Sequence, residues 1–275
     1  MRVLAVIVGT PLRKVSGATN AGRQLSRATA ELVDLELALM WDEDRTERSG
    51  PMTTRYVRAT DLLGPLGRLL PRSLRTPLFQ SGIPALIARG RYDVVHIHNL
   101  IPTFAALRIA RAAQRAGVPY VISTHGFVEI VQYARINGFG PVRSALIHVV
   151  LTRPFRKVVA GATRLFMLSD RETPLLGALG VPAERTDVVT NGVNEYYLEP
   201  VPPESIEVVR RRWPIADGPV VFFMGSLHAY KGVGTFLASL ALLDRPVTAV
   251  VAGRFNDPGE PGRLLDAAGV PEHVR

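Results

Sequence analysis

The stretch Val220-Val-Phe-Phe-Met-Gly-Ser-Leu-His-Ala-Tyr-Lys-Gly-Val-Gly234 predicts a strand, a loop and the beginning of a helix. Its first five residues form an apolar run that is short enough for a buried strand, and Gly225 ends that run. A polar loop then continues to Lys231 and Gly232. The apolar residues that follow recur at helical spacing: Phe236, Leu237, Leu240 and Leu243. The stretch is therefore one strand–loop–helix unit of an α/β sheet.

The loop of this unit has the chemistry of a phosphate-binding site. The first backbone N–H groups of a helix have no acceptor within the helix, and together with a cation such as Lys231 they favour an anion. The loop is not a P-loop, because the pattern G-x-x-x-x-G-K-[ST] does not occur in the chain. An ordinary strand-to-helix turn with a lysine on its surface is the alternative interpretation.

The same alternation of strand and helix extends over the rest of the chain. Apolar runs predict strands at residues 2–8, 35–39, 55–59, 93–98, 120–124, 164–168, 186–190 and 247–251. Helical patterns separate most of these runs, which favours a doubly wound α/β architecture with parallel sheets. Ligands of such sheets bind beyond the carboxyl ends of the strands. His98, His125, Asn191 and Ser226 all fall at such ends.

Three segments between the strands are interpreted from their composition. Residues 42–53 are expected to form a charged loop, and residues 127–145 a long polar loop that leads into a basic helix over 146–161. Residues 61–90 are expected to be helical, basic and interrupted by prolines, with Arg68, Arg72 and Arg75 interleaved with leucines. Such a pattern is typical of an amphipathic element on anionic lipid. The alternative is a helix that packs on its own domain, with arginine stems along apolar surface.

The composition is that of an ordinary globular chain. Of 275 residues, 47% are hydrophobic and 21% charged, and cysteine is absent, which excludes disulfides, a thiolate nucleophile and cysteine-based metal sites. No apolar run approaches the roughly 20 residues of a membrane span, and the first residues lack a signal-peptide pattern. We expect a cytoplasmic protein that is either soluble or peripheral at the inner face of the membrane.

The positive charge is concentrated in one part of the chain. The net charge is +9, and residues 51–168 alone hold 16 basic and 3 acidic residues, a local charge of +13. This excess indicates an anionic partner, which is a nucleic acid, an anionic lipid surface or a phosphorylated substrate. The nucleic-acid hypothesis rests on charge alone, because no basic–aromatic motif accompanies it. We therefore expect an anionic membrane surface and no nucleic acid.

Seven motifs together resemble one known family. They are the Ser16-Gly17 loop, Asp93-Val-Val-His-Ile-His98, Gly117-Val-Pro119, Thr124-His125-Gly126, Ser169-Asp-Arg-Glu172, Asn191-Gly-Val-Asn194 and Gly225-Ser-Leu-His-Ala-Tyr-Lys231-Gly232. By their order and spacing, the chain resembles the retaining nucleotide-sugar glycosyltransferases of family four. The resemblance implies the GT-B fold, in which two Rossmann-like domains face each other.

The resemblance also implies a division into domains. Residues 1–198 correspond to a complete N-terminal Rossmann-like domain on the acceptor side. Residues 204–275 correspond to the first half of a second, C-terminal Rossmann-like domain on the donor side. The family's glutamate motif, two glutamates separated by seven residues, has no counterpart in this second part. The chain therefore looks truncated within the C-terminal domain.

Site residues follow from the resemblance. Catalytic roles fall on His125 and Lys231, the latter because a cation stabilises the charge that grows on the departing diphosphate. Donor-binding roles fall on Gly17, Gly225, Ser226, Lys231 and Gly232, and contacts to the sugar or the acceptor on His98 and Asn191. The family usually has glycine in place of Ser16 and arginine in place of Ser226. No metal and no other cofactor is expected, because two distant histidines without an acidic or cysteine partner make a poor metal site.

The function implied by the resemblance is transfer of a sugar from a nucleotide-sugar donor to a glycan or lipid-linked acceptor with retention of configuration. The alternative is a non-catalytic GT-B remnant or binding module, because the donor-site glutamate motif is missing. We expect this chain to fold through about residue 198, to be less stable beyond it, and to transfer sugar poorly or not at all.

Overall fold

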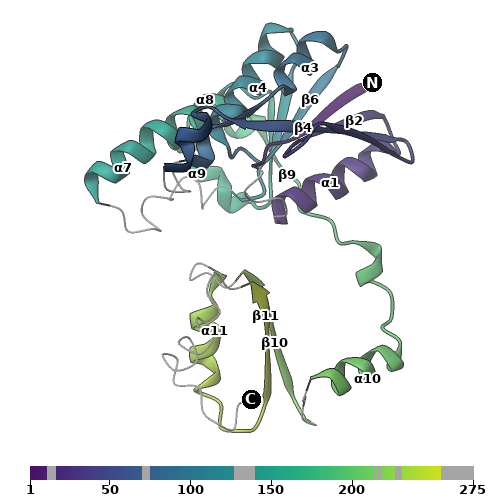
Figure 1. Cartoon of the computed structure of the whole chain (residues 1–275). Helices are drawn as coiled ribbons and strands as arrows, with labels where there is room; N and C mark the ends of the chain where they lie inside the picture. Colours follow the sequence, from purple (N-terminus) through teal and green to yellow (C-terminus); the bar gives the residue numbers. More distant parts are fainter. Residues whose placement is uncertain are drawn as a thin grey trace. The chain divides into compact units, whose positions relative to one another are not determined.

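The computed structural model describes residues 1–10, 17–69, 75–126, 140–213, 215, 218–226 and 231–254. The chain divides into two compact units, Met1–Val193 and Asn194–Arg275, which we call unit 1 and unit 2 (Figure 1). None of the described helices combines the length and the apolar content that crossing a bilayer requires.

Unit 1 is an α/β domain whose described residues form a nine-stranded sheet. Its strands are β1 Arg2–Ile7, β2 Asp34–Trp41, β3 Arg45–Ser49, β4 Met52–Asp61, β5 Phe79–Ser81, β6 Val94–His98, β7 Tyr120–Ser123, β8 Arg164–Met167 and β9 Thr186–Val188. Its α-helices are α1 Gly17–Ala30, α3 Ile83–Arg89, α4 Thr103–Arg115, α7 Pro141–Ile147, α8 Arg153–Ala160 and α9 Thr173–Ala178. The seven strands predicted for this part of the chain are confirmed, within a few residues at their ends.

The strands are arranged in the order β3-β4-β2-β1-β6-β7-β8-β9, and β5 pairs with β4. β3 and β5 run antiparallel to β4, and the other neighbours are parallel. The chain adds strands on one side of β1 as far as β4, and then returns to add β6 to β9 on the other side. This order confirms the predicted doubly wound α/β fold and places the change of winding direction between β1 and β6.

Helices cover both faces of the sheet. The odd-numbered apolar residues of β1 belong to a core cluster that includes Ala30 of α1. The even-numbered ones belong to a larger cluster with apolar residues of α3, α4 and α8, which lie on the opposite face (Figure 1). A strand that is buried on both faces has a continuous apolar sequence, which explains the run in residues 2–8. Burial of each Leu, Ile or Val side chain stabilises the fold by roughly 1.5–3 kcal/mol.

The loop predicted over residues 42–53 is wrong, because β3 lies there. β3 pairs antiparallel with β4, from Arg45 opposite Tyr56 to Ser49 opposite Met52. All its side chains are exposed, so no alternation of apolar and polar residues marks the strand in the sequence. The strand therefore depends on its pairing with β4. The Arg45 guanidinium also lies over the Tyr56 ring, with its central carbon 4.1 Å from the ring centroid.

The helix predicted over residues 61–90 is wrong for most of its length. The described part contains 3-10 turns at Gly64–Leu69 and Thr76–Leu78, followed by β5 and α3. Prolines stand in the first turn of Thr76–Leu78 and of α3, where the missing N–H is tolerated but a preceding helix cannot continue. Arg72 lies outside the described residues, and the Arg75 guanidinium forms an ion pair with Asp61 at 2.6 Å.

The basic helix predicted over 146–161 is present but begins earlier. α7 starts at Pro141, and a π-helical turn, His148–Thr152, joins it to α8. Proline at the first helical position favours this start. The last five residues of the predicted loop over 127–145 are therefore helical, and residues 127–139 lie outside the described residues.

Unit 2 contains helix α10 Pro203–Arg212, strand β10 Val220–Ser226, helix α11 Val233–Leu240 and strand β11 Thr248–Arg254. β10 and β11 pair in parallel, with Val220 opposite Thr248. The strand and the helix predicted from residues 220–234 are confirmed, and so is the strand predicted at 247–251, whereas residues 227–230 of the predicted loop lie outside the described residues.

α11 buries one face of the two-stranded sheet of unit 2. The core cluster of this unit consists of Val233, Leu237, Leu240 and Val247. The Phe223 ring of β10 packs beside Phe236 of α11, with ring centroids 5.2 Å apart. The alternate side chains Phe222 and Met224 are 57% and 73% exposed. The described part of unit 2 thus has an apolar sheet face that no described helix covers.

A buried carboxylate joins three strands of unit 1 near their N-terminal ends. Glu36 of β2 is only 6% exposed, and the Tyr92 hydroxyl before β6 donates a hydrogen bond to it at 3.0 Å. The Arg55 guanidinium of β4 donates to the other carboxylate oxygen, and the Arg2 guanidinium of β1 lies 3.5 Å away. Burial, followed by the charge of Glu36, raises the pKa of Tyr92 to about 12.

We expect substitution of Glu36 by alanine to lower the free energy of unfolding by about 2–3 kcal/mol, because the buried Tyr92 hydroxyl loses its acceptor and two arginines lose their shared partner. Urea unfolding followed by circular dichroism measures this loss. Glu43→Ala is the matched control, because the Glu43–Arg45 pair is exposed and should contribute about 0.5 kcal/mol or less. Equal losses in the two variants would contradict a special role for the Glu36 cluster.

Candidate functional site

Polar side chains gather in unit 1 at the carboxyl edge of the sheet, beside the change of winding direction. His98 is the last residue of β6, His125 follows β7, and Asn191 follows β9. Nε2 of His125 lies 3.4 Å from Nδ1 of His98, and the Asn191 side chain approaches the His125 imidazole. The structure therefore brings together three of the predicted site residues, one from the end of each strand.

A third histidine extends this cluster. His96 and His98 are separated by one residue of β6, so their side chains lie on the same face. Their ring centroids are 4.0 Å apart, and those of His98 and His125 are 5.6 Å apart in a stacked arrangement. Nε2 of His96 lies 2.8 Å from the Ser123 hydroxyl of β7. The site residues expected from the sequence include His98 but not His96. Because side chains alternate between the two faces of a strand, His96 could have been expected on the same face as His98.

The backbone of His125 has an unusual conformation. Its φ angle is +32°, and that of Gly126 is +106°. A positive φ is uncommon outside glycine, and such positions cost about 1–3 kcal/mol and occur preferentially at functional sites. The preceding residue, Thr124, holds this backbone in place: its N–H donates to the Phe166 carbonyl at 3.0 Å, and its hydroxyl donates to Glu172 Oε2 at 2.9 Å.

Glu172 reaches the site from the turn before α9. Ser169 caps this turn, because its hydroxyl accepts a hydrogen bond from the Arg171 N–H at 3.2 Å. Glu172 itself is 6% exposed, and its carboxylate is turned toward Thr124. From the sequence, Glu172 is identifiable only as the last residue of the motif Ser169-Asp-Arg-Glu172, so its contact with the residue before His125 was missed.

Asn99 fixes the ends of β1 and β6 relative to each other. Its φ angle is +61°, a value that asparagine tolerates better than most residues. Its side-chain amide donates to the Val8 carbonyl at 2.8 Å and to the Ile101 carbonyl at 3.2 Å. This tether lies at the change of winding direction, directly after His98.

Burial keeps the three histidines neutral near pH 7. It lowers the pKa of His96 to about 4, with a further contribution from His125, and it lowers the pKa of His98 well below its ordinary value, with contributions from His96 and His125. Burial also lowers the pKa of His125, although hydrogen bonding by the Asn191 side chain opposes the shift. Each neutral imidazole has one N–H donor and one lone-pair acceptor, which suits recognition of a hydroxyl group.

Two imidazole nitrogens of this cluster have no hydrogen-bond partner in the part of the chain that the structure describes. They are Nε2 of His98 and Nδ1 of His125, and both are buried. Most buried polar atoms in folded proteins are paired, and an unpaired one costs about 1–3 kcal/mol. The cluster thus retains unused hydrogen-bonding capacity at the carboxyl edge of the sheet.

Helix α1 approaches the cluster closely at Gly22, whereas Gly17, which was predicted to bind the donor, is the first residue of that helix. A Cβ added at Gly22 would lie 3.1 Å from Cβ and Cγ of His98 and 3.2 Å from Ile7. A Cβ added at Gly17, the first residue of α1, would meet no atom within 4 Å. Within the described residues, Gly17 is therefore a helix start, and Gly22 is the glycine that lets the helix pack against the site.

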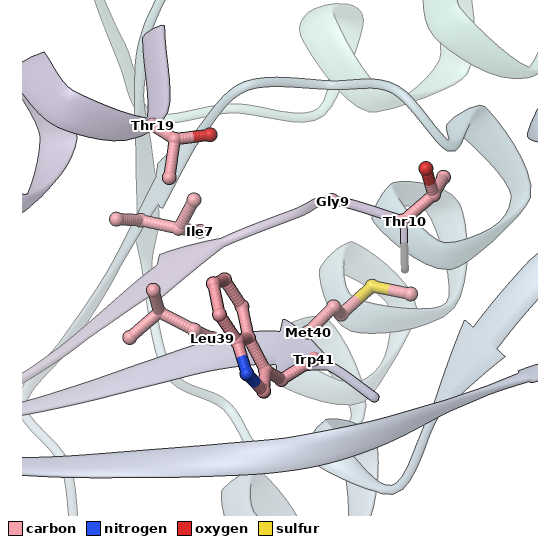
Figure 2. A pocket seen from close by; sticks show the side chains of 7 residues that line it. All are labelled: Ile7, Gly9, Thr10, Thr19, Leu39, Met40 and Trp41. Atoms are coloured by element: carbon pink, nitrogen blue, oxygen red, sulfur yellow. The ribbon is translucent and has the colours of Figure 1, made fainter. Parts of the chain in front are cut away.

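A small hollow lies beyond the ends of β1 and β2. It is lined by Ile7, Gly9, Thr10, Thr19, Leu39, Met40 and Trp41, and Figure 2 shows Thr10, Thr19 and Trp41 around it. Its volume of about 10 Å³ is near the minimum for one water molecule. The described residues therefore do not by themselves form a sugar-sized pocket at this point.

The other predicted site residues belong to unit 2. Gly225 and Ser226 end β10, and the Ser226 side chain lies outside what the structure describes. Lys231 is exposed, and Gly232 adopts a left-handed φ of +78° as the residue that caps α11. A Cβ added at Gly225 would be in ordinary contact, 3.9 Å from Phe223, so strand packing alone does not require glycine there.

The next feature is the arrangement of histidine and acidic side chains that could bind a metal ion. Within the described ranges, no group of three or more histidine, aspartate or glutamate residues is arranged to hold a metal ion. The chain contains one Asp-x-Asp pattern, Asp42-Glu43-Asp44, between β2 and β3. There the Asp44 carboxylate accepts a hydrogen bond from the Arg58 backbone N–H at 2.8 Å.

The depressed pKa of His96 predicts a loss of stability in mild acid. Between its ordinary pKa of 6.5 and its folded value of about 4, the unfolded chain binds a proton that the folded chain does not, so stability falls as the pH decreases. We expect His96→Gln to remove about 2 kcal/mol of the loss between pH 7 and pH 5. Urea unfolding at both pH values tests this, and the exposed His148, substituted by glutamine, is the control. Parallel pH profiles for wild type and His96→Gln would contradict the prediction.

Comparison with known proteins supports the fold. Crystal structures of Anabaena Alr3699/HepE in complex with UDP and of WaaG, a glycosyltransferase involved in lipopolysaccharide biosynthesis, both superpose with a TM-score of 0.63, at 16% and 15% identity. They match 100% and 99% of this chain, which covers 68% and 69% of theirs. These similarities confirm the predicted GT-B-like fold.

Sequence comparison gives the family. The D-inositol 3-phosphate glycosyltransferases of Thermobispora bispora and Catenulispora acidiphila are 30% and 31% identical over 229 and 222 residues, or 78% and 75% of this chain. The chain covers 49% of each, so it spans about half the length of these curated relatives. The model of Glycosyltransferase Family 4 matches residues 15–196. As its seven motifs indicated, this chain belongs to glycosyltransferase family 4.

Proposed function

We propose that the chain takes part in retaining transfer of a sugar from a nucleotide-sugar donor to a glycan or lipid-linked acceptor. The observation that carries the proposal is the junction of β10 and α11 in unit 2. There Lys231 and the left-handed Gly232 directly precede the first turn of a helix. Membership of a glycosyltransferase family supports the reaction class.

The junction has the properties that a departing diphosphate requires. As the bond between sugar and diphosphate breaks, negative charge grows on the leaving phosphate oxygens. The Lys231 ammonium and the first backbone N–H groups of α11 would stabilise that charge more strongly in the transition state than in the bound donor. A left-handed Gly232 allows the chain to enter the helix without a side chain at the phosphate.

The histidine cluster of unit 1 supplies a different function. A neutral His125 imidazole can donate a hydrogen bond to one hydroxyl group or accept one from it. We assign it to the transferred sugar or the acceptor, together with His98 and Asn191. This assignment agrees with their position at the carboxyl edge of a doubly wound sheet, where ligands of such folds bind.

The relatives suggest which compounds to test. Two are named D-inositol 3-phosphate glycosyltransferases, which makes a phosphorylated cyclitol one acceptor to examine beside lipid-linked glycans. The similar Anabaena protein was crystallised with UDP and with UDP-glucose, which makes these the first donor ligands. We propose no metal, no other cofactor and no nucleic-acid partner.

The alternative is a binding module that keeps the fold without catalysing transfer. No glutamate motif follows β10 in the sequence given, and in the family this motif holds the donor. The two proposals differ in their outcome when donor and acceptor are supplied together. Transfer with a retained anomeric configuration, observed by NMR of the product, supports the enzyme, whereas donor binding without turnover supports the binding module.

We expect Lys231→Ala to weaken UDP binding about 10- to 100-fold, the amount lost with a charge-assisted contact of roughly 1.5–3 kcal/mol. Isothermal titration calorimetry with UDP and UDP-glucose measures the affinity. Lys157→Ala is the matched control, because it removes an exposed lysine from α8 of unit 1. Unchanged binding by Lys231→Ala, or an equal loss in the control, would contradict the phosphate site.

We also propose that unit 1 lies on anionic membrane at the cytoplasmic face. Helix α4 packs between α3 and α8, and none of the three contains an acidic residue. Their exposed cations are Arg89, Arg108, Arg111, Arg115, Arg153, Arg156 and Lys157. Such a concentration of positive charge on neighbouring helices attracts anionic headgroups by about 1 kcal/mol for each basic residue near the surface.

Sedimentation with vesicles tests this surface. We expect binding to vesicles that contain anionic phospholipid, little binding to zwitterionic vesicles, and release by salt. Replacing Arg111, Arg115 and Arg156 by glutamine should weaken binding at least tenfold, whereas Arg48→Gln on β3 should leave it unchanged. Equal partitioning into both kinds of vesicle would overturn the proposal.

A further inference from the structure

We infer that His98 is a positioning residue that sets the tautomer and the orientation of His125. The inference about hydrogen bonding rests on the geometry of unit 1. Its consequence for sugar transfer rests on the proposed function, in which His125 contacts the sugar or the acceptor. The test below therefore uses a readout that needs neither donor nor turnover.

The His98 side chain is itself held in one position. It is completely buried, and its ring lies against that of His96 in a tilted arrangement, with a centroid distance of 4.0 Å. On the other side, α1 packs so closely that a methyl group at Gly22 would lie 3.1 Å from the first ring atom of His98. A side chain enclosed in this way presents Nδ1 in one fixed direction.

The orientation of the His125 ring depends on its contact with His98. Its Nε2 lies 3.4 Å from Nδ1 of His98, and its backbone has a positive φ that must be held by its surroundings. Thr124 and Glu172 anchor the backbone on one side through their 2.9 Å hydrogen bond. His98 contacts the other end of the residue, the imidazole, and so restricts the ring.

The proton shared between His98 and His125 links the tautomers of the two rings. A hydrogen bond between two neutral imidazoles requires one N–H between Nδ1 of His98 and Nε2 of His125. If His98 donates, then His125 carries its own proton on Nδ1 and offers a donor there. If His125 donates, then its Nδ1 is an acceptor. The tautomer of the fixed His98 ring therefore sets the proton position on His125, and with it the hydrogen bond that His125 offers to a ligand hydroxyl.

The experiment is NMR of the chain labelled with 15N-histidine, at one pH at which the histidines are neutral. In the wild-type chain we expect His125 to show one protonated and one unprotonated ring nitrogen, the signature of a single tautomer. In His98→Leu we expect the two signals to move toward each other, because both tautomers become populated. His98→Asn places a polar atom where Nδ1 was and should largely restore the separation.

Gly22→Ala provides an independent variant that leaves both histidines in place. The added methyl group displaces the His98 ring, so the His125 signals should shift. Gly177→Ala on α9 is its control, because a Cβ there would meet no atom within 4 Å. If His98→Leu does not fold, the comparison of Gly22→Ala with Gly177→Ala decides the question.

The outcomes separate positioning from simple packing. A residue that only fills space would lower the unfolding temperature in His98→Leu and leave the His125 tautomer unchanged. Unchanged His125 signals in His98→Leu, or in Gly22→Ala where His98→Leu is unfolded, would overturn the inference. A chain that binds no nucleotide-sugar but shows the expected shifts would contradict the proposed function and leave the positioning role of His98 intact.

Discussion

The structure of unit 1 depends on the parallel pairing of β1 with β2 on one side and with β6 on the other. In this register Ile7 lies opposite both Leu39 and His98, so the three strands end at nearly the same level. The chain winds away from β1 in both directions, and the loops that leave the strand ends diverge. A doubly wound sheet creates its ligand-binding edge in this way. His98 lies at this edge because it is the last residue of β6.

Polar groups at this edge are maintained against an energetic cost. Three imidazoles are held close together and neutral, two of their nitrogens have no hydrogen-bond partner among the described residues, and His125 has a strained backbone. Each feature costs on the order of 1–3 kcal/mol. The large apolar cluster behind the edge, with helices on both faces of the sheet, offsets this cost. Such a balance is expected where a fold keeps hydrogen-bonding capacity for a ligand.

Most of the fold could be predicted, because buried parallel strands and amphipathic helices leave strong periodic signals. The apolar runs at residues 2–8 and 220–224 are examples. The errors occurred where that signal is absent. All five residues of β3 are exposed, and only its pairing with β4 defines the strand. In residues 61–90 the prolines, which the sequence analysis treated as interruptions of one helix, separate short turns, a strand and a short helix.

At the site, local sequence patterns were enough to identify the residue types, their order and the strand ends at which His98, His125 and Asn191 stand. They also identified the strand–loop–helix that carries Lys231. Tertiary contacts alone bring the rings of His96, His98 and His125 together, join Glu172 to Thr124, and make Gly22 the close-packing glycine of α1. The physical reason is that strand and helix periodicities act over a few residues, whereas these contacts join elements far apart in the chain. Their distances depend on strand register and helix packing, which no local pattern encodes.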